Sequence, residues 1–180
     1  MTHKTMKINP FLRELLISAL LGTALFVVLQ NTIQTCIVSS SSMEPDLQVG
    51  QRLVVNKVNY YFDSPKRGDI IVFRPPANPN STPYIKRVIG LPGDTVEIKE
   101  GRVFINGEPL REPYIKETPL YSMAPEFIML NNYFVLGDNR NDSNDSHVWG
   151  TVPRENIIGK ASLSIWPMNE WGLAPNYNFD

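Results

Sequence analysis

The sequence predicts a mainly β protein, with an antiparallel sheet or partial barrel that follows one N-terminal transmembrane helix. A single strongly apolar segment lies near the N-terminus, short β-type runs alternate with turn residues after it, and no long helical periodicity appears there. The 15 prolines and 11 glycines are scattered, which favours a turn-rich β domain over a helical bundle. A chain of 180 residues can bury one substantial core, so one main domain is expected.

The N-terminal part divides into a basic tail, residues 1–14, and a transmembrane anchor, residues 15–38. Residues 15–29 carry no charge, and the stretch up to residue 38 stays uncharged although it becomes more polar. A membrane-spanning helix needs about 20 residues, so this segment is long enough. The basic residues before it favour a cytoplasmic N-terminus, which puts residues 39–180 on the extracytoplasmic side; these basic residues are Lys4, Lys7 and Arg13.

Two other interpretations of the apolar segment compete with a retained anchor. A cleavable signal peptide has the same basic start and apolar run, but no convincing small-x-small cleavage site follows, and the residues before Cys36 make a poor lipoprotein motif. A helix buried in a soluble core would leave the basic flank unexplained. We therefore expect a retained anchor.

From about residue 47 the sequence predicts short strands separated by turns. Glu100-Gly101 is expected to join two of these strands as a hairpin, and Asn106-Gly107 is a second tight-turn signal. Residues 108–132 are proline-rich and less regular, so we expect an excursion from the main sheet there. The expected strands cover residues 52–55, 69–73, 95–99, 102–105, 133–136 and 162–166.

Charge and ligand content argue against several classes of function. The 17 basic and 18 acidic residues give a net charge of −1, which disfavours a nucleic-acid-binding protein with a broad basic face. His3, His147 and the single Cys36 do not form a cluster, so no metal site and no cofactor are expected.

A serine-rich turn, residues 39–45, follows the apolar segment directly. A serine hydroxyl is a weak nucleophile unless a base removes its proton. Lys86 can serve as that base if burial lowers its pKa from about 10.4. In a strand, Arg87 faces away from Lys86, so we expect Arg87 to stay solvated while Lys86 is buried. A polar linker followed by an ordinary strand with an exposed lysine is the competing interpretation.

The polar loop from Gly137 to Gly150 follows a predicted strand. Its Asn, Asp, Ser and Gly residues favour turns, so a plain turn is the simplest interpretation. The loop also combines hydroxyls, carboxylates and an arginine. That mixture suits a hydrogen-bonded scaffold that orients a buried base.

Taken together, these segments resemble bacterial-type signal peptidase I, the membrane-anchored serine proteases that remove signal peptides. A lone Ser-x-Met-x-Pro motif would be weak, but several motifs in the right order after an anchor are specific. The resemblance covers most of the chain, and its motifs are Ser40-x-Ser42-Met43-x-Pro45 and residues 67–73, 84–94 and 137–150. It implies a Ser/Lys-dyad endopeptidase without a cofactor, whose partners are signal-peptide-bearing preproteins and the lipid bilayer. The membrane would be the bacterial plasma membrane or the thylakoid.

The resemblance also implies roles for individual residues. It gives Ser42 as the nucleophile, Lys86 as the general base and Ser40, with the backbone N–H of Ser42, as the oxyanion donor. Ser143 matches the serine that orients the lysine, and Asp145 matches an acidic residue that supports the loop. The residues implied to line the pocket for small side chains before the cleavage site are Val38, Tyr84 and Ile85.

The chain departs from the family pattern at four positions. Ser39 and Ser41 stand where proline and glycine are frequent, so we expect a less rigid serine turn. Asp46 replaces a frequent threonine, and His147 stands where arginine is common. None of these departures removes a group implied to be catalytic.

Three alternative functions remain open. One is a Ser42–His147 triad completed by Asp138, Asp142 or Asp145, which is chemically reasonable. A self-cleaving repressor with Ser-Lys chemistry is disfavoured by the anchor and by the lack of a DNA-binding region. An inactive, membrane-anchored β module that only binds exported peptides is disfavoured by the intact set of serines and lysine.

The C-terminal region suggests a second contact with the membrane. Trp166, Trp171 and Leu173, together with Leu47, are expected to form an apolar surface that rests on the bilayer, where tryptophan is favoured. Core packing of Trp166 is the alternative. The sequence indicates neither the oligomeric state nor the set of preproteins that are cut.

Overall fold

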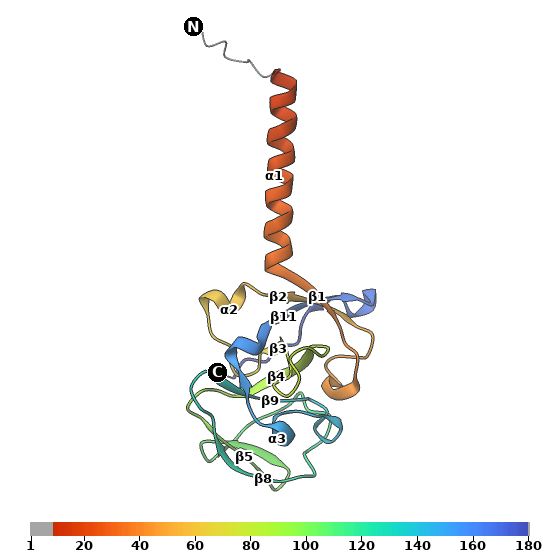
Figure 1. The fold of residues 1–180 in the computed structure, drawn as a ribbon. Coiled ribbons are helices and arrows are strands. Elements are labelled where there is room, and N and C mark those ends of the chain that lie inside the picture. The colour runs from red at the N-terminus through yellow and green to blue at the C-terminus, as the bar shows by residue number, and fades with distance from the viewer. Residues whose placement is uncertain (1–8, 180) are drawn as a thin grey trace.

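The computed structural model describes residues 9–179 and shows a long helix that stands on a β domain (Figure 1). The prediction of a mainly β fold with one N-terminal apolar helix is confirmed. The basic residues Lys4 and Lys7 and the histidine His3 lie outside the described residues.

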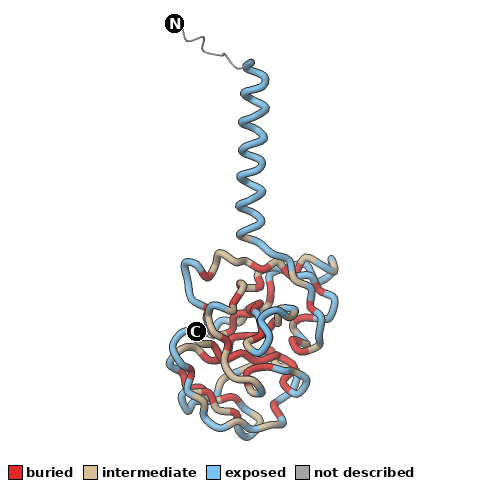
Figure 2. The backbone as a smooth tube through the Cα atoms, in the orientation of Figure 1, coloured by how far each residue is buried: buried red, intermediate tan, exposed pale blue. Residues whose placement is uncertain are grey.

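Helix α1 covers Pro10–Thr32, and none of its residues is buried (Figure 2). Its start is capped by Asn9, whose side chain accepts a hydrogen bond from the backbone N–H of Phe11, and Pro10 occupies the first turn, where no N–H is needed. The 23 residues of α1 span about 35 Å at about 1.5 Å per residue. The helix is therefore long and apolar enough to cross a membrane.

The boundaries of this helix differ from the predicted anchor. It begins at Pro10 rather than residue 15 and ends at Thr32 rather than residue 38. Strand β1, Ile33–Ile37, follows at once and pairs antiparallel with β2, Arg52–Asn56. The β-branched residues around Thr32 and Ile33 favour a strand, and β2 supplies the hydrogen-bonding partner that sequence patterning could not reveal.

A curled antiparallel sheet forms the larger part of the domain. It contains the strands predicted around residues 52–55, 69–73, 133–136 and 162–166, and Tyr84–Gly90. In spatial order its strands are β1, β2, β11 (Ile157–Trp166), β3 (Ile70–Phe73), β4 (Tyr84–Gly90), β9 (Asn132–Leu136) and β10 (Val152–Pro153), with β12 (Gly172–Leu173) paired to β11.

A second, four-stranded sheet lies at the end of the domain away from α1 (Figure 1). The predicted hairpin is present, because Glu100 and Gly101 both adopt positive φ angles, 50° and 69°, between two strands. The segment 108–132 leaves the main sheet and contributes two strands here. In spatial order the strands are β7 (Glu108–Pro109), β6 (Arg102–Ile105), β5 (Thr95–Lys99) and β8 (Met123–Phe127).

The remaining helices are single turns. They are α2 (Asn59–Phe62), α3 (Ser146–Trp149) and the 3-10 turns η1 (Ser41–Met43), η2 (Arg140–Asp142), η3 (Arg154–Asn156) and η4 (Met168–Glu170).

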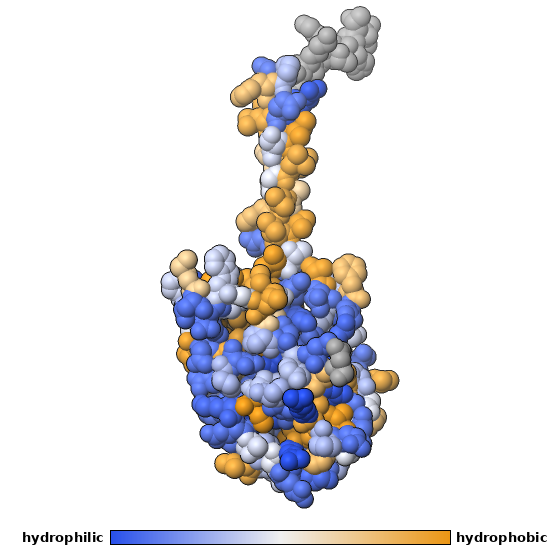
Figure 3. Space-filling model, turned by 180° about the vertical axis from the view of Figure 1, so that it is seen from behind, coloured by the Kyte–Doolittle hydropathy of each residue, from blue (hydrophilic) through white to orange (hydrophobic). Residues whose placement is uncertain are grey.

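Apolar side chains continue from α1 onto the adjoining end of the β domain (Figure 3). Trp166, Trp171 and Leu173 are exposed, as a membrane-contacting surface requires. The expectation for Leu47 is wrong: its side chain is fully buried and packs in the core with Met43 and Leu53. Leu47 follows a turn that folds back onto the sheet, and this return is not visible in the local sequence.

Candidate active site

The serine turn is held by its own apolar residue. Ser42 lies in η1 (Ser41–Met43), and the buried side chain of Met43 packs in the core beneath it. The backbone N–H of Glu44 donates to the carbonyl of Ser41 at 3.0 Å, and that of Leu47 donates to the carbonyl of Met43 at 2.8 Å. These contacts fix the backbone on which the Ser42 hydroxyl is carried.

Lys86 meets this hydroxyl from strand β4. Its side chain is only 4% exposed, and its Nζ lies 2.6 Å from the Oγ of Ser42. Burial lowers the pKa of Lys86 to about 8, against the opposing charges of Asp145 and Asp138. A neutral amine at this distance can accept the serine proton, which an exposed lysine could not do near neutral pH.

Ser40 is placed beside the same hydroxyl. The Oγ atoms of Ser40 and Ser42 are 3.2 Å apart, and Ser40 has an extended backbone just before the 3-10 turn. A hydroxyl in this position can donate to an oxygen that is bound next to Ser42.

The polar loop after β9 is hydrogen-bonded to the backbone of the serine turn. The backbone N–H of Asn139 donates to the carbonyl of Ser42 at 3.1 Å, and the Asn139 amide donates to the carbonyl of Ser41 at 3.2 Å. The hydroxyl of Ser41 donates to Asp142 at 2.6 Å. At Gly137, any Cβ would overlap the carbonyl oxygen of Ser42, so the loop approaches this closely only because glycine is there.

Asp145 organises the rest of the loop. Its fully buried carboxylate accepts from the backbone N–H of Gly137 at 2.9 Å and from the backbone N–H of His147 at 3.3 Å, which caps α3. The Nδ1 of His147 lies 2.6 Å from the same carboxylate, and its ring stacks on Tyr121 with centroids 3.9 Å apart. His147 is not among the residues that line the cavity next to Ser42.

Ser143 lies close to the site without contacting the lysine through a hydrogen bond. Its Oγ is buried and has no hydrogen-bond partner within residues 9–179. A Cβ at Gly137 would overlap this oxygen, so the hydroxyl faces the glycine that also adjoins Ser42. The bond to Lys86 that the family resemblance implies is therefore not formed in this structure.

A cavity of about 270 Å³ opens beside Ser42. The three residues expected to line a substrate pocket, Val38, Tyr84 and Ile85, all line it, together with Ser40, Ser42 and Lys86. Strand β9 pairs with β4 only from Arg87 onward, and β3 occupies the other edge of β4. Within the described chain, the first three residues of β4 thus keep one edge without a partner strand.

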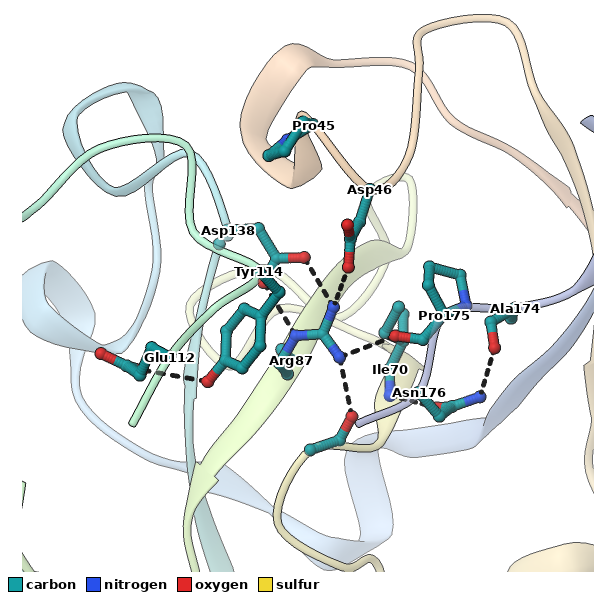
Figure 4. A network of polar contacts seen from close by, with 12 residues as sticks. Pro45, Asp46, Ile70, Arg87, Glu112, Tyr114, Asp138, Ala174, Pro175 and Asn176 are labelled. Atoms are coloured by element: carbon teal, nitrogen blue, oxygen red, sulfur yellow. Dashed lines mark hydrogen bonds and ion pairs between the residues drawn. The ribbon is translucent and has the colours of Figure 1, made fainter. Parts of the chain in front are cut away.

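The expectation for Arg87 is wrong, because its side chain is completely buried. It bonds to Asp138 and Asp46 and lies over the ring of Tyr114 at 4.1 Å (Figure 4). Strand alternation places Arg87 opposite Lys86 but cannot show that other segments cover this second face.

Two residues near the candidate site make contacts that the sequence did not predict. Asn139 holds the serine turn, and Asp46 reaches Arg87. The only sequence signals for them were the polar motif around Asn139 and the departure from the family pattern at Asp46. Between residues 9 and 179 no group of His, Cys, Asp and Glu side chains is arranged to hold a metal ion.

Comparison with known proteins gives consistent similarities. The family model described as signal peptidase, peptidase S26, matches residues 11–166. A signal peptidase I of Leptolyngbya laminosa is 52% identical over 149 residues, 78% of this chain and 73% of that protein. A signal peptidase IB of Staphylococcus aureus (strain MRSA252) is 34% identical over 87% of each chain. The thylakoidal processing peptidase 1 of Arabidopsis thaliana is 38% identical over 72% of this chain and 41% of its own.

Proposed function

The chain belongs to the signal peptidase family, peptidase S26, and we propose that it removes signal peptides with Ser42 as nucleophile and Lys86 as general base. One observation carries the assignment of these two residues. The buried Nζ of Lys86 lies 2.6 Å from the Oγ of Ser42, and burial lowers the pKa of Lys86 to about 8.

The proposed reaction is acyl transfer. Neutral Lys86 takes the proton of Ser42 while the Oγ attacks the scissile carbonyl carbon. The resulting oxyanion accepts hydrogen bonds from the Ser40 hydroxyl and the backbone N–H of Ser42. The Lys86 ammonium then protonates the leaving amine, and the C–N bond breaks to give an acyl-enzyme. Lys86 then deprotonates a water molecule, which attacks the ester carbonyl. The C–Oγ bond breaks, the signal peptide leaves as a carboxylate product, and the Lys86 ammonium returns the proton to the Ser42 oxygen.

The free edge of β4 is the proposed binding site for the substrate backbone. An extended peptide can add to Tyr84–Lys86 as a further strand, with main-chain hydrogen bonds that do not depend on its sequence. The cavity lined by Val38 and Ile85 then receives the side chain before the scissile bond. A preference for small residues at that position is part of the proposal and rests on the family to which the chain belongs.

The proposed topology places α1 across the membrane, with the N-terminus in the cytoplasm and residues 39–180 on the other side. The length and hydropathy of α1 support a membrane-anchored protein, and the basic residues before it support this orientation. The relatives include a bacterial signal peptidase and a thylakoidal processing peptidase, so the proposal allows either a bacterial plasma membrane or a thylakoid membrane.

The function is tested by incubating the purified full-length protein with a preprotein and following the mature product. We expect the wild type to cleave it, while Ser42→Ala and Lys86→Ala lose cleavage completely. Lys86→Arg should fail as well, because a guanidinium stays protonated and cannot accept the serine proton. Substantial cleavage by any of the three variants would contradict the dyad. Binding without cleavage by the wild type would favour a peptide-binding module instead.

A further inference from the structure

Arg87 is a buried arginine with every donor used. It follows Lys86 directly in β4 and is fully buried on the opposite face of the strand. Its five N–H groups all have acceptors at 2.8 to 2.9 Å (Figure 4). Nε and Nη2 donate to the two carboxylate oxygens of Asp138, and Nη2 also donates to Asp46. Nη1 donates to the backbone carbonyls of Gly68 and Pro175. A buried guanidinium without such partners is very unfavourable, so these acceptors are fixed in position relative to β4.

Two of these acceptors belong to the segments that hold Ser42. Asp138 immediately precedes Asn139, whose backbone N–H donates to the carbonyl of Ser42 at 3.1 Å. Asp46 directly follows the serine turn, four positions after Ser42 in the sequence. Arg87 therefore holds the serine turn from both sides, and it does so from the residue next to Lys86.

The two carboxylates differ in what their loss would do. Asp138 is fully buried and binds the guanidinium through both oxygens, so its removal would leave a buried charge unpaired. The side chain of Asp46 is 25% exposed and makes a single bond to Arg87. Changing Asp46 leaves the main partner of the arginine in place and alters only the attachment of the serine turn.

We propose that Asp46 is a positioning residue, whose bond to Arg87 sets the location of the Ser42 hydroxyl relative to the Lys86 amine. The inference rests on the proposed Ser42–Lys86 chemistry. Proton transfer between these groups requires hydrogen-bond contact, and a displacement of about 1 Å lowers rates by about 100-fold. Asp46 does not line the cavity beside Ser42, so it should affect kcat rather than KM.

Glu44 provides a matched control on the same turn. It forms an ion pair with Lys116 at 2.9 Å, and its side chain is 24% exposed, close to the 25% of Asp46. The Lys116 side chain is 44% exposed, and Lys116 lies outside β4. Loss of the Glu44 charge therefore removes an acidic group from the turn without touching its link to the strand that carries Lys86.

The experiment measures kcat, KM and thermal stability of full-length variants with a preprotein substrate in detergent micelles. Asp46→Glu keeps the charge but adds a methylene, so it should push the turn away and lower kcat by about tenfold or more. Asp46→Asn keeps the length and an oxygen acceptor, so it should stay within about threefold of wild type. KM in both variants, and kcat of Glu44→Gln, should stay within about twofold of wild type.

A wild-type kcat for Asp46→Glu would overturn this inference. A larger fall in kcat for Asp46→Asn than for Asp46→Glu would overturn it as well, because the charge of Asp46 rather than its position would then matter. Losses that appear in KM, or that follow the loss of folded protein in the melting curves, would overturn it too. If the wild type itself fails to cleave the preprotein, the result contradicts both the proposed function and this inference. A cleaving wild type with an unaffected Asp46→Glu variant would remove this inference alone.

Discussion

The proposed role of Lys86 as general base depends on a balance between burial and nearby carboxylates. Burial lowers its pKa, and the charges of Asp145 and Asp138 act in the opposite direction. Both carboxylates are themselves occupied, because Asp138 binds Arg87 and Asp145 lies against the ring of His147. The acidic residues therefore hold the site together, while the apolar surroundings account for the lowered pKa.

His147→Ala separates the proposed dyad from a histidine-based triad. We expect cleavage to stay within about threefold of wild type, because His147 contacts Asp145 and Tyr121 and does not line the cavity. Unfolding should become easier by about 1 kcal/mol through the lost hydrogen bond. Preprotein cleavage and thermal melting measure the two effects. A loss of cleavage as complete as that of Ser42→Ala would support the triad.

At the residue scale, the sequence predicts which side chains come together but not what surrounds them. Ser42, Lys86 and the three expected pocket residues lie around one cavity, while their roles stay predictions. Arg87 was expected in solvent and is buried, and the bond from Ser143 to Lys86 is not formed. Strand alternation tells which residues share a face, but the segments that cover each face come from distant parts of the chain.

Strand β4 is the element on which the site depends. One face carries Lys86, the opposite face carries Arg87, and the edge of its first three residues is left free by β9. The turn before β2 brings Ser42 to this strand, and the loop after β9 fixes the turn from the other side. Three segments that are far apart in the sequence therefore meet at one end of β4.

The exposed apolar residues of β12 and its neighbourhood belong to the end of the domain near α1. Trp171 is 67% and Leu173 is 83% exposed. We expect the double variant Trp171→Ser/Leu173→Ser to cleave a membrane-inserted preprotein about three to ten times more slowly, because less apolar surface enters the bilayer. Cleavage of a short soluble peptide should be unchanged, and comparing the two substrates in the same vesicles measures this difference.

Phe127→Ser is the control for this experiment. Phe127 is also exposed, but it lies in β8 at the end of the domain away from α1 (Figure 1). The Phe127→Ser variant should cleave both substrates at the wild-type rate. An equal loss on the soluble peptide in the Trp171/Leu173 variant would contradict a membrane role for these residues.

Elements with a clear local pattern or turn signal were predictable, and elements that depend on a distant partner strand were not. The hairpin at Glu100-Gly101 follows from its turn residues, and β5 and β6 follow from alternation. β1 was assigned to the anchor, and two-residue strands such as β10 exist only because a neighbouring strand pairs with them. No local signal distinguishes such segments from loops.

At the scale of the whole molecule, the β4 strand that carries Lys86 lies where several segments of the chain meet. The segment 108–132 reaches the site through Tyr114, and the C-terminal tail reaches it through Pro175. Both contact Arg87, so the second sheet and the tail help to bury the strand that carries Lys86. Because these contacts cover the face of β4 opposite Lys86, the burial of this strand is a property of the fold rather than of any one motif.

Burying this lysine should lower the stability of the protein. Because the folded pKa of about 8 lies below the unfolded value, the unfolded state binds more protons between about pH 8 and pH 10.4, and stability rises with pH in that window. Lys86→Met should remove this rise and stabilise the protein at pH 7 by up to about 3 kcal/mol. Denaturant unfolding at pH 7 and pH 10 measures both effects. A variant less stable than wild type at pH 7, with the pH dependence unchanged, would contradict a depressed pKa.

The pH dependence of kcat/KM for preprotein cleavage tests the central claim most directly, because it reports the ionisation of the free enzyme. We expect activity to rise with pH through an apparent pKa of about 8, as Lys86 becomes neutral, and we expect His147→Ala to leave this limb in place. A limb near the ordinary histidine value of about 6.5 that disappears in His147→Ala would contradict Lys86 as the base.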